Sequence, residues 1–106
     1  MFTRIMECYA KSGMAEEATK RVRLEVLPIL RAQPGFRDLI TLRDGQDRQR
    51  VICLSFWDTK ENADTYARQH YDWIVQRLTS LLESRPTLET LQVEMSTVHN
   101  IASRAA

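Results

Sequence analysis

Tyrosine, histidine, tryptophan and arginine recur at helical spacing in the second half of the chain. These are Tyr66, His70, Trp73 and Arg77, at positions i, i+4, i+7 and i+11. A continuous helix would carry them on one stripe. An imidazole has a pKa near ~6.5, which suits a general base at neutral pH, and polar-tipped aromatics suit a pocket for a flat ligand. We predict His70 as the catalytic base, with Tyr66 and Trp73 binding substrate.

Two further aromatic residues complete the candidate site. Trp57 directly precedes a helix cap, and Tyr9 stands at the end of the first strand-like segment. Both are predicted to contact substrate. A structural interpretation stays open, in which the helix edge packs on the rim of a sheet, Trp57 fills the core and His70 is exposed. No carboxylate is spaced to orient His70.

Composition excludes several other classes of protein. The chain has 106 residues, a net charge of +1 and three glycines, so a single domain fits and a phosphate-cradling loop or nucleic-acid surface does not. Cys8 and Cys53 lack metal-ligand spacing and are predicted to be buried free thiols, which suggests a cytoplasmic protein. No apolar run reaches the ~18 residues of a membrane span, and neither a metal nor a cofactor is expected.

Turn and cap residues divide the chain into six elements. Ser12 is a plausible helix cap, Pro28 predicts a kink, and Asp58 with Glu61 resembles a capping box. The second helical segment has a possible joint near 69–71. Strands are predicted over about 2–10, 36–43, 50–57 and 88–98, helices over about 14–30 and 60–81, a single domain over 1–99 and a flexible tail over 100–106.

The element order β-α-β-β-α-β predicts an α+β, ferredoxin-like fold with a four-stranded antiparallel sheet. Both helices then cover one face of the sheet and leave the other bare. Strand 50–57 is apolar on both faces, with Val51, Cys53 and Trp57 on one side and Leu54 and Phe56 on the other. A second copy of the chain would cover the bare face, so we predict a homodimer that closes a two-chain barrel.

Two motifs carry a family resemblance. The segments Gln33-Pro34-Gly35-Phe36 and Ser55-Phe56-Trp57-Asp58-Thr59-Lys60-Glu61-Asn62-Ala63 resemble the antibiotic biosynthesis monooxygenase (ABM) family of dimeric α+β barrel proteins. The resemblance covers nearly the whole chain. It implies oxidation of aromatic or quinol-type phenols by oxygen without metal or flavin, in a pocket between sheet and helices. In that scheme Trp57 matches a strand tryptophan of the family.

The resemblance also leaves other functions open. Family monooxygenases can place an asparagine where this chain has Cys53, and a thiol cannot make two amide hydrogen bonds. The alternative is a non-catalytic dimeric module that binds a small hydrophobic metabolite. A third is an isomerase-like relative acting on reactive carbonyl compounds. The haem-degrading branch fits poorly, because the first strand has no asparagine and His70 would need a shifted helix register.

Overall fold

The computed structural model describes residues 1–101. The strands are β1 (Phe2–Tyr9), β2 (Phe36–Arg43), β3 (Arg50–Trp57) and β4 (Thr87–Gln92). The first helical segment runs through α1 (Ala15–Arg21), the π-helical η1 (Val22–Val26) and α2 (Leu27–Arg31). The second runs through α3 (Lys60–Tyr66), the π-helical η2 (Ala67–Tyr71), α4 (Asp72–Leu78) and the 3₁₀ turn η3 (Thr79–Leu81).

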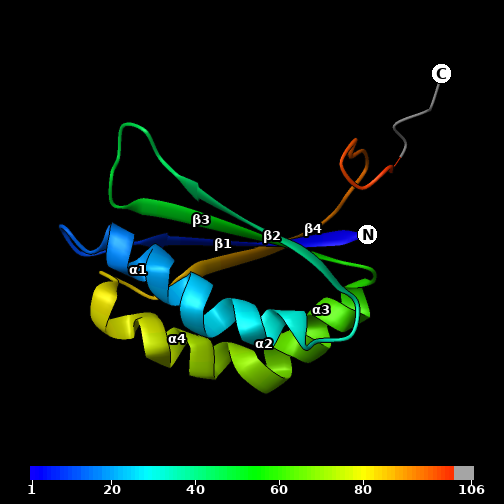
Figure 1. Cartoon of the computed structure of the whole chain (residues 1–106), viewed down its shortest axis with the longest axis horizontal. Helices are drawn as coiled ribbons and strands as arrows, with labels where there is room; N and C mark the ends of the chain where they lie inside the picture. The colour runs from blue at the N-terminus through cyan, green and yellow to red at the C-terminus, as the bar shows by residue number, and fades with distance from the viewer. Residues whose placement is uncertain (102–106) are drawn as a thin grey trace.

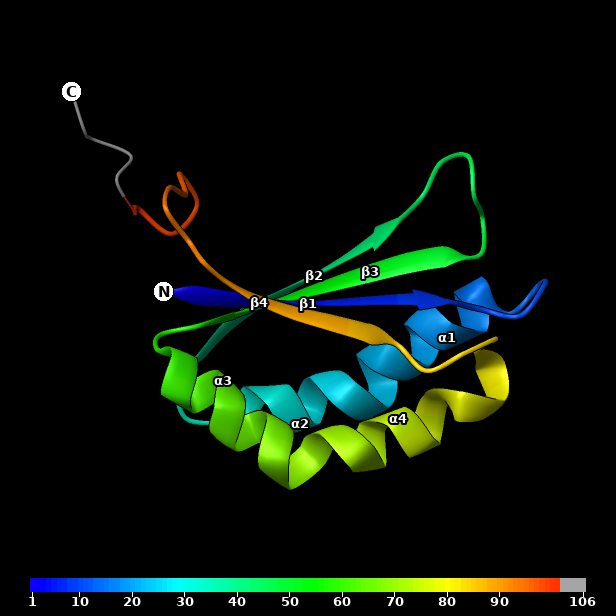
Figure 2. The ribbon, with the colours of Figure 1, turned by 180° about the vertical axis from the view of Figure 1, so that it is seen from behind.

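The four strands form one antiparallel sheet in the order β2-β3-β1-β4. Both helical segments cover the same face of this sheet, as Figures 1 and 2 show from opposite sides. This is the α+β, ferredoxin-like arrangement predicted from the element order. The predicted bounds of β2 and β3 are confirmed, and β3 is central as its apolar faces indicated.

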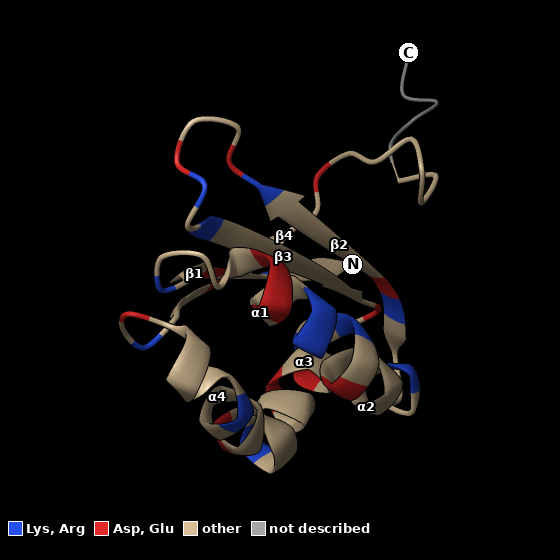
Figure 3. Cartoon of the chain, turned by 60° about the vertical axis from the view of Figure 1, so that its left-hand side comes forward, with Lys and Arg blue, Asp and Glu red and all other residues tan. Residues whose placement is uncertain are grey.

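The core lies between the sheet and the helices. On β3 the residues facing the helices are buried and the alternate residues are half-buried. Cys8 and Cys53 are both buried free thiols, as predicted. In the ribbon of Figure 3, charged residues occur in the β2–β3 loop and along the helices, and most of the visible strand ribbon is uncharged.

The β3–α3 joint is built around a close backbone approach. Gly35 has φ +78°, and its carbonyl accepts a 2.8 Å hydrogen bond from the Asp58 N–H. The helix cap is Thr59, whose hydroxyl accepts from the Asn62 N–H at 3.0 Å, so the predicted capping box of Asp58 and Glu61 is displaced by one residue. Asp58 instead forms an ion pair with Arg37. The two family-like motifs are therefore in contact.

Both helical segments contain a π-helical turn. In the first, the Leu27 N–H bonds to the Val22 carbonyl, five residues back. Pro28 follows directly, lacks an N–H and would clash with a carbonyl four residues back, so the wider turn accommodates it. In the second, η2 lies at the predicted joint. The N-terminal cap of α1 is Met14 rather than the predicted Ser12, and it makes no side-chain cap bond.

The last strand is shorter than its sequence pattern suggested. β4 ends at Gln92, which pairs with Phe2 of β1, and one further hydrogen bond of 2.9 Å joins the Val93 N–H to the Met1 carbonyl. The following residues form a hook closed by a bridge between Ser96 and Ile101. Within it, His99 packs 4.8 Å from the Phe56 ring, on the face opposite the helices. Of the tail predicted to be flexible, 100–106, residues 102–106 lie outside the described residues.

Gly35→Ala should destabilise the fold strongly. An added Cβ would lie 2.2 Å from the Asn62 side chain, whereas at Gly13 it would meet nothing within 4 Å. Both glycines have positive φ, at +78° and +76°, so Gly13→Ala measures the backbone strain alone, about 1–2 kcal/mol. Urea unfolding should show a clearly larger loss for Gly35→Ala. Equal losses would mean that the contact with Asn62 contributes nothing.

Candidate functional site

A cavity lies between the sheet and the two helical segments. The centres of water molecules can occupy about 40 Å³ of it, room for a few waters, and the whole space between its walls, open solvent at the mouth included, is about 410 Å³. All four strands and both helical segments contribute side chains to its wall. These are Arg4 and Met6 of β1, Leu39 of β2, Cys53 and Ser55 of β3, Leu88 of β4, Val22, Val26 and Leu30 of the first helical segment, and Tyr66, Tyr71 and Ile74 of the second.

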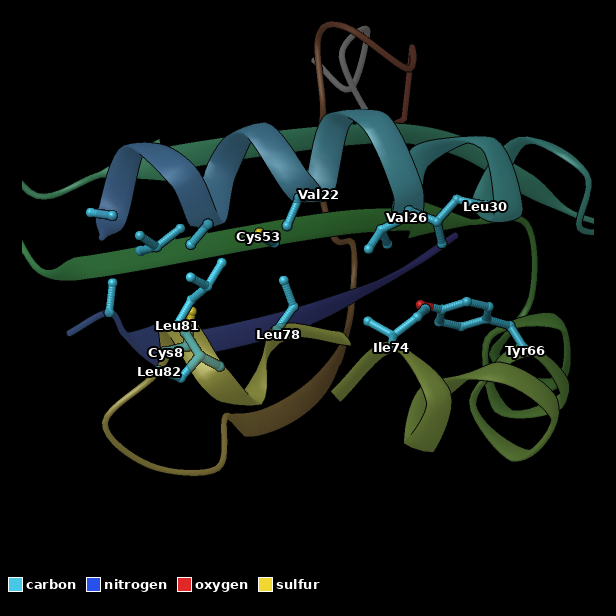
Figure 4. Close-up of a cluster of buried hydrophobic side chains, with 14 of the residues drawn as sticks. Cys8, Val22, Val26, Leu30, Cys53, Tyr66, Ile74, Leu78, Leu81 and Leu82 are labelled. Atoms are coloured by element: carbon cyan, nitrogen blue, oxygen red, sulfur yellow. The ribbon is translucent and has the colours of Figure 1, made fainter. Parts of the chain in front are cut away.

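The wall is mostly apolar, and its polar atoms come from few residues. Val22 and Val26 lie in one π turn and Tyr71 in the other, so both irregular turns face the cavity. Figure 4 shows the Tyr66 hydroxyl directed inward toward Ile74, beneath the first helical segment. π turns often accompany functional sites, because they move side chains off the regular helix stripe.

An aromatic stack runs from the core to the cavity wall. Trp57 is fully buried, stacks on Tyr66 with ring centroids 5.0 Å apart, and meets Phe36 edge-on at 5.6 Å. Its indole N–H donates a 2.9 Å hydrogen bond to the Ser55 hydroxyl. His70 continues the stack, with its ring 6.1 Å from that of Tyr66. Trp57 thus holds two lining residues, Ser55 and Tyr66, from behind.

The buried charge at this site is Arg4. It is 9% exposed, and no carboxylate of residues 1–101 forms an ion pair with it. Its guanidinium carbon lies 5.9 Å from the ring centroid of Tyr66 and 5.5 Å from that of Tyr71. The Arg4 Nη2 and the Tyr71 hydroxyl are both buried without a hydrogen-bond partner. Two polar groups that normally find partners are therefore unpaired at one cavity.

The other titratable groups of the wall keep their protons at neutral pH. Burial raises the pKa of Cys53 and of Tyr66 to about 12 each, and it also raises the pKa of Tyr71. A guanidinium stays charged in proteins. The lining set of residues 1–101 therefore contains hydrogen-bond donors and one positive charge, but no side chain that would accept a proton.

The structure separates the five residues that the sequence suggested for the site. Tyr66 lines the cavity, whereas Trp57 lies behind it as a core residue, and His70 lies beside Tyr66 outside the lining set. Trp73 is 46% exposed and stacks on Arg77 at 5.6 Å. Tyr9 is 36% exposed at the end of β1. The π turn η2 lies between Tyr66 and Trp73 and shifts the helix register there, so these residues do not follow one regular helical stripe.

Two lining residues were missed from the sequence. Arg4 alternates with Met6 and Cys8 on one strand face, so an arginine in an otherwise apolar set was the available signal. Tyr71 reaches the cavity because the π turn brings it there, and the regular helical spacing of the sequence gave no sign of this. Within residues 1–101 there is no group of three or more His, Cys, Asp or Glu suited to a metal ion, and no helix has the length and apolarity to cross a membrane.

Comparison with known proteins places the chain in a family. The family model described as antibiotic biosynthesis monooxygenase matches residues 1–71. The chain belongs to the ABM family. No curated protein matches the sequence. The first motif of the resemblance lies wholly inside the matched region, and so does the β3–α3 joint.

Solved ABM-like structures share the fold at low sequence identity. A monooxygenase from the gene ActVA-Orf6 of Streptomyces coelicolor, in complex with nanaomycin D, has a TM-score of 0.76 at 15% identity over 90% of this chain and 88% of that one. Putative antibiotic biosynthesis monooxygenases give 0.73 at 15% over 87% and 88% (Nitrosomonas europaea) and 0.71 at 17% over 89% and 97% (Bordetella bronchiseptica). At such identities the similarity establishes the fold alone.

Alkaline pH should destabilise the fold through its two thiols. Burial raises the pKa of Cys8 to about 11 and of Cys53 to about 12, from an ordinary 9.0, so the folded chain keeps protons that the unfolded chain releases. Stability is therefore present below pH 9 and falls as pH rises above it, by at most about 1.4 kcal/mol per thiol for each pH unit.

Urea unfolding across this range measures the effect. The double variant Cys8→Ala/Cys53→Ala should lose stability less steeply than the natural chain, whatever its stability at neutral pH, since tyrosines contribute equally to both. Identical slopes would contradict the protonated, buried state of the thiols.

Proposed function

We propose that this ABM-type small-molecule protein is a cofactor-independent monooxygenase that oxidises an aromatic or quinol-type phenol. The observation that supports the proposal is the cavity between sheet and helices, whose wall is apolar apart from a few polar atoms and is reached by Tyr66. The family of the chain and the fold shared with a monooxygenase in complex with nanaomycin D point the same way. A flat aromatic ligand would enter through the open mouth of the cavity. Because the interior of the cavity is narrow, the two helical segments would have to separate as the ligand enters.

The residues of the chain would then hold the substrate and exclude water while the substrate supplies the electrons. The phenol loses its proton, transfers electrons to O₂, and gains one oxygen atom as a new carbonyl, while the other oxygen leaves as water. An apolar wall favours this reaction because it keeps competing water from the reactive carbon. The proton acceptor has to lie outside the lining set, and His70, stacked against Tyr66, is our candidate.

Oxygen uptake with a panel of hydroxylated polycyclic phenols tests this function. We expect uptake with the natural chain and a rate roughly a hundredfold lower for His70→Ala, the usual loss when a general base is removed. His99→Ala is the matched control, because His99 packs against Phe56 on the opposite face of the sheet and should leave the rate unchanged. No uptake across the panel would contradict the proposal.

A second candidate is a binding module without turnover. The observation that favours it is the protonated wall, in which Cys53 stands where family monooxygenases can carry an asparagine. This function predicts that the same phenols raise the melting temperature of the protein without oxygen uptake. Uptake and thermal stabilisation together would exclude it.

We further propose that the chain functions as a homodimer through the open face of the sheet. On that face Ile5, Ile52, Leu54 and Phe56 are half-buried, and Ile40, Leu42 and Leu91 are 37–44% exposed. The hook of residues 96–101 covers only the corner near Phe56. A second copy is a suitable cover because it offers the same apolar strands in return.

Leu42→Glu should dissociate this dimer. Leu42 is 44% exposed on the open face, and Leu24, on η1, is 59% exposed on the outer helix surface. Leu24→Glu is therefore the matched control, with the same change of side chain and charge. Light scattering at micromolar concentration should show a dimer for the natural chain and for Leu24→Glu, and a monomer for Leu42→Glu. A monomeric natural chain would contradict the proposal.

A further inference from the structure

The unpaired guanidinium of Arg4 points to the chemistry of the ligand. Arg4 is 9% exposed on the helix-facing side of β1, and its Nη2 is buried without a partner. A buried charge without an opposite charge destabilises the fold, because nothing compensates its desolvation. Such a group persists where something bound supplies the missing charge. We propose that the cavity binds a flat, mainly apolar ligand through one ionised oxygen held by Arg4 and Tyr71.

The position of Arg4 limits what can supply that oxygen. Eleven other residues line the same cavity, and none of them is an aspartate or glutamate. A second copy of the chain on the open face would lie across the sheet from Arg4, on the side of Thr3 and Ile5. Because no side chain of residues 1–101 pairs with Arg4, we infer that its partner is a molecule inside the cavity.

The surroundings of Arg4 indicate which chemical group of this molecule binds there. The guanidinium lies against the rings of Tyr66 and Tyr71, so these aromatic faces already contact it from two directions. Arg85 also lies 5.9 Å from the Tyr71 ring, but its charge is paired with Asp72 at 3.2 Å. The unpaired Tyr71 hydroxyl can donate a hydrogen bond to the same oxyanion. Two donors, one of them the charged guanidinium of Arg4, favour a carboxylate or an ionised phenol.

This recognition gives the proposed oxygenase a reason to work without a base in its wall. A phenol that binds beside Arg4 has its pKa lowered by the positive charge, so it gives its proton more readily to His70 outside the lining set. The inference rests on the proposed function only for that step. The recognition of an anion stands independently, because a binding module would use the same contacts.

Binding to the full chain tests the inference without any turnover. The probes are 4-nitrophenol, whose ionised form absorbs visible light, with its non-ionising counterpart 4-nitroanisole, and benzoate with neutral benzamide. We expect each anion to bind at least about tenfold more tightly than its neutral counterpart, and bound nitrophenol to titrate about one pH unit or more below free nitrophenol. Preference for benzoate alone would identify a carboxylate ligand, and a lowered nitrophenol pKa would identify a phenolate ligand.

Arg4→Met and Arg50→Met form a matched pair of variants. Both remove one positive charge from a strand, but Arg50 is paired with Glu7 and Asp44, away from the cavity. Arg4→Met should abolish the preference for anions and raise the melting temperature of the free protein, because it removes an unpaired buried charge. Arg50→Met should keep the preference and lower the melting temperature. Arg4→Lys, which keeps the charge without the planar fork, should bind anions more weakly than the natural chain.

Several results would overturn the inference. These are equal binding of anions and neutral counterparts by the natural chain, or an unchanged preference in Arg4→Met. If Arg4→Met fails to fold, the comparison of probes on the natural chain and on Arg4→Lys still decides. Anion binding without oxygen uptake would contradict the oxygenase proposal and support the anion site at Arg4. Oxygen uptake that is unaffected by Arg4→Lys, with no preference for anions, would support the oxygenase proposal and contradict the anion site.

Discussion

The burial of Trp57 at the end of β3 is the packing interaction on which the helix layer and the cavity depend. Trp57 pairs across the sheet with Phe2 of β1 and with Phe36 of β2, so it lies where three strands meet. Its ring stacks on Tyr66, and its N–H bonds to Ser55. One fully buried side chain therefore fixes the second helical segment on the sheet and holds two residues of the cavity wall in place.

The sheet could be predicted from the sequence because strand-forming residues and turn residues are local signals. The apolar residues on both faces of 50–57 and the Pro34-Gly35 segment before 36–43 indicated the central hairpin with the bounds that the structure has. The end of β4 could not be predicted in this way. The alternation continues past Gln92, but the chain leaves the edge of β1 after the hydrogen bond from Val93 to Met1 and forms the hook of residues 96–101, and this change is a feature of tertiary structure.

The candidate site was predicted less completely, for a different physical reason. A helical stripe assumes constant register, and the π turn η2 breaks that register between Tyr66 and Trp73. Tyr66 stays on the cavity side, Tyr71 joins it, and Trp73 turns outward to Arg77. The sequence predicted a joint near 69–71 in the second segment and a kink at Pro28 in the first, but neither prediction gave the change of helix register that follows from a π turn.

The charged residues on the two faces of β1 differ in whether they are paired. Its open face carries Glu7, which pairs with Arg50 of the neighbouring strand, so the charge there is matched within the chain. Its helix face carries Arg4, and the charge there is not matched by any ion pair among residues 1–101. Packing alone would favour an apolar side chain beside Met6 and Cys8 at this position. Because stability is the small difference between large opposing terms, an unmatched buried charge substantially lowers the free energy of unfolding of a fold of this size. The contrast between the paired and unpaired arginines of one sheet is therefore better explained by ligand recognition than by folding.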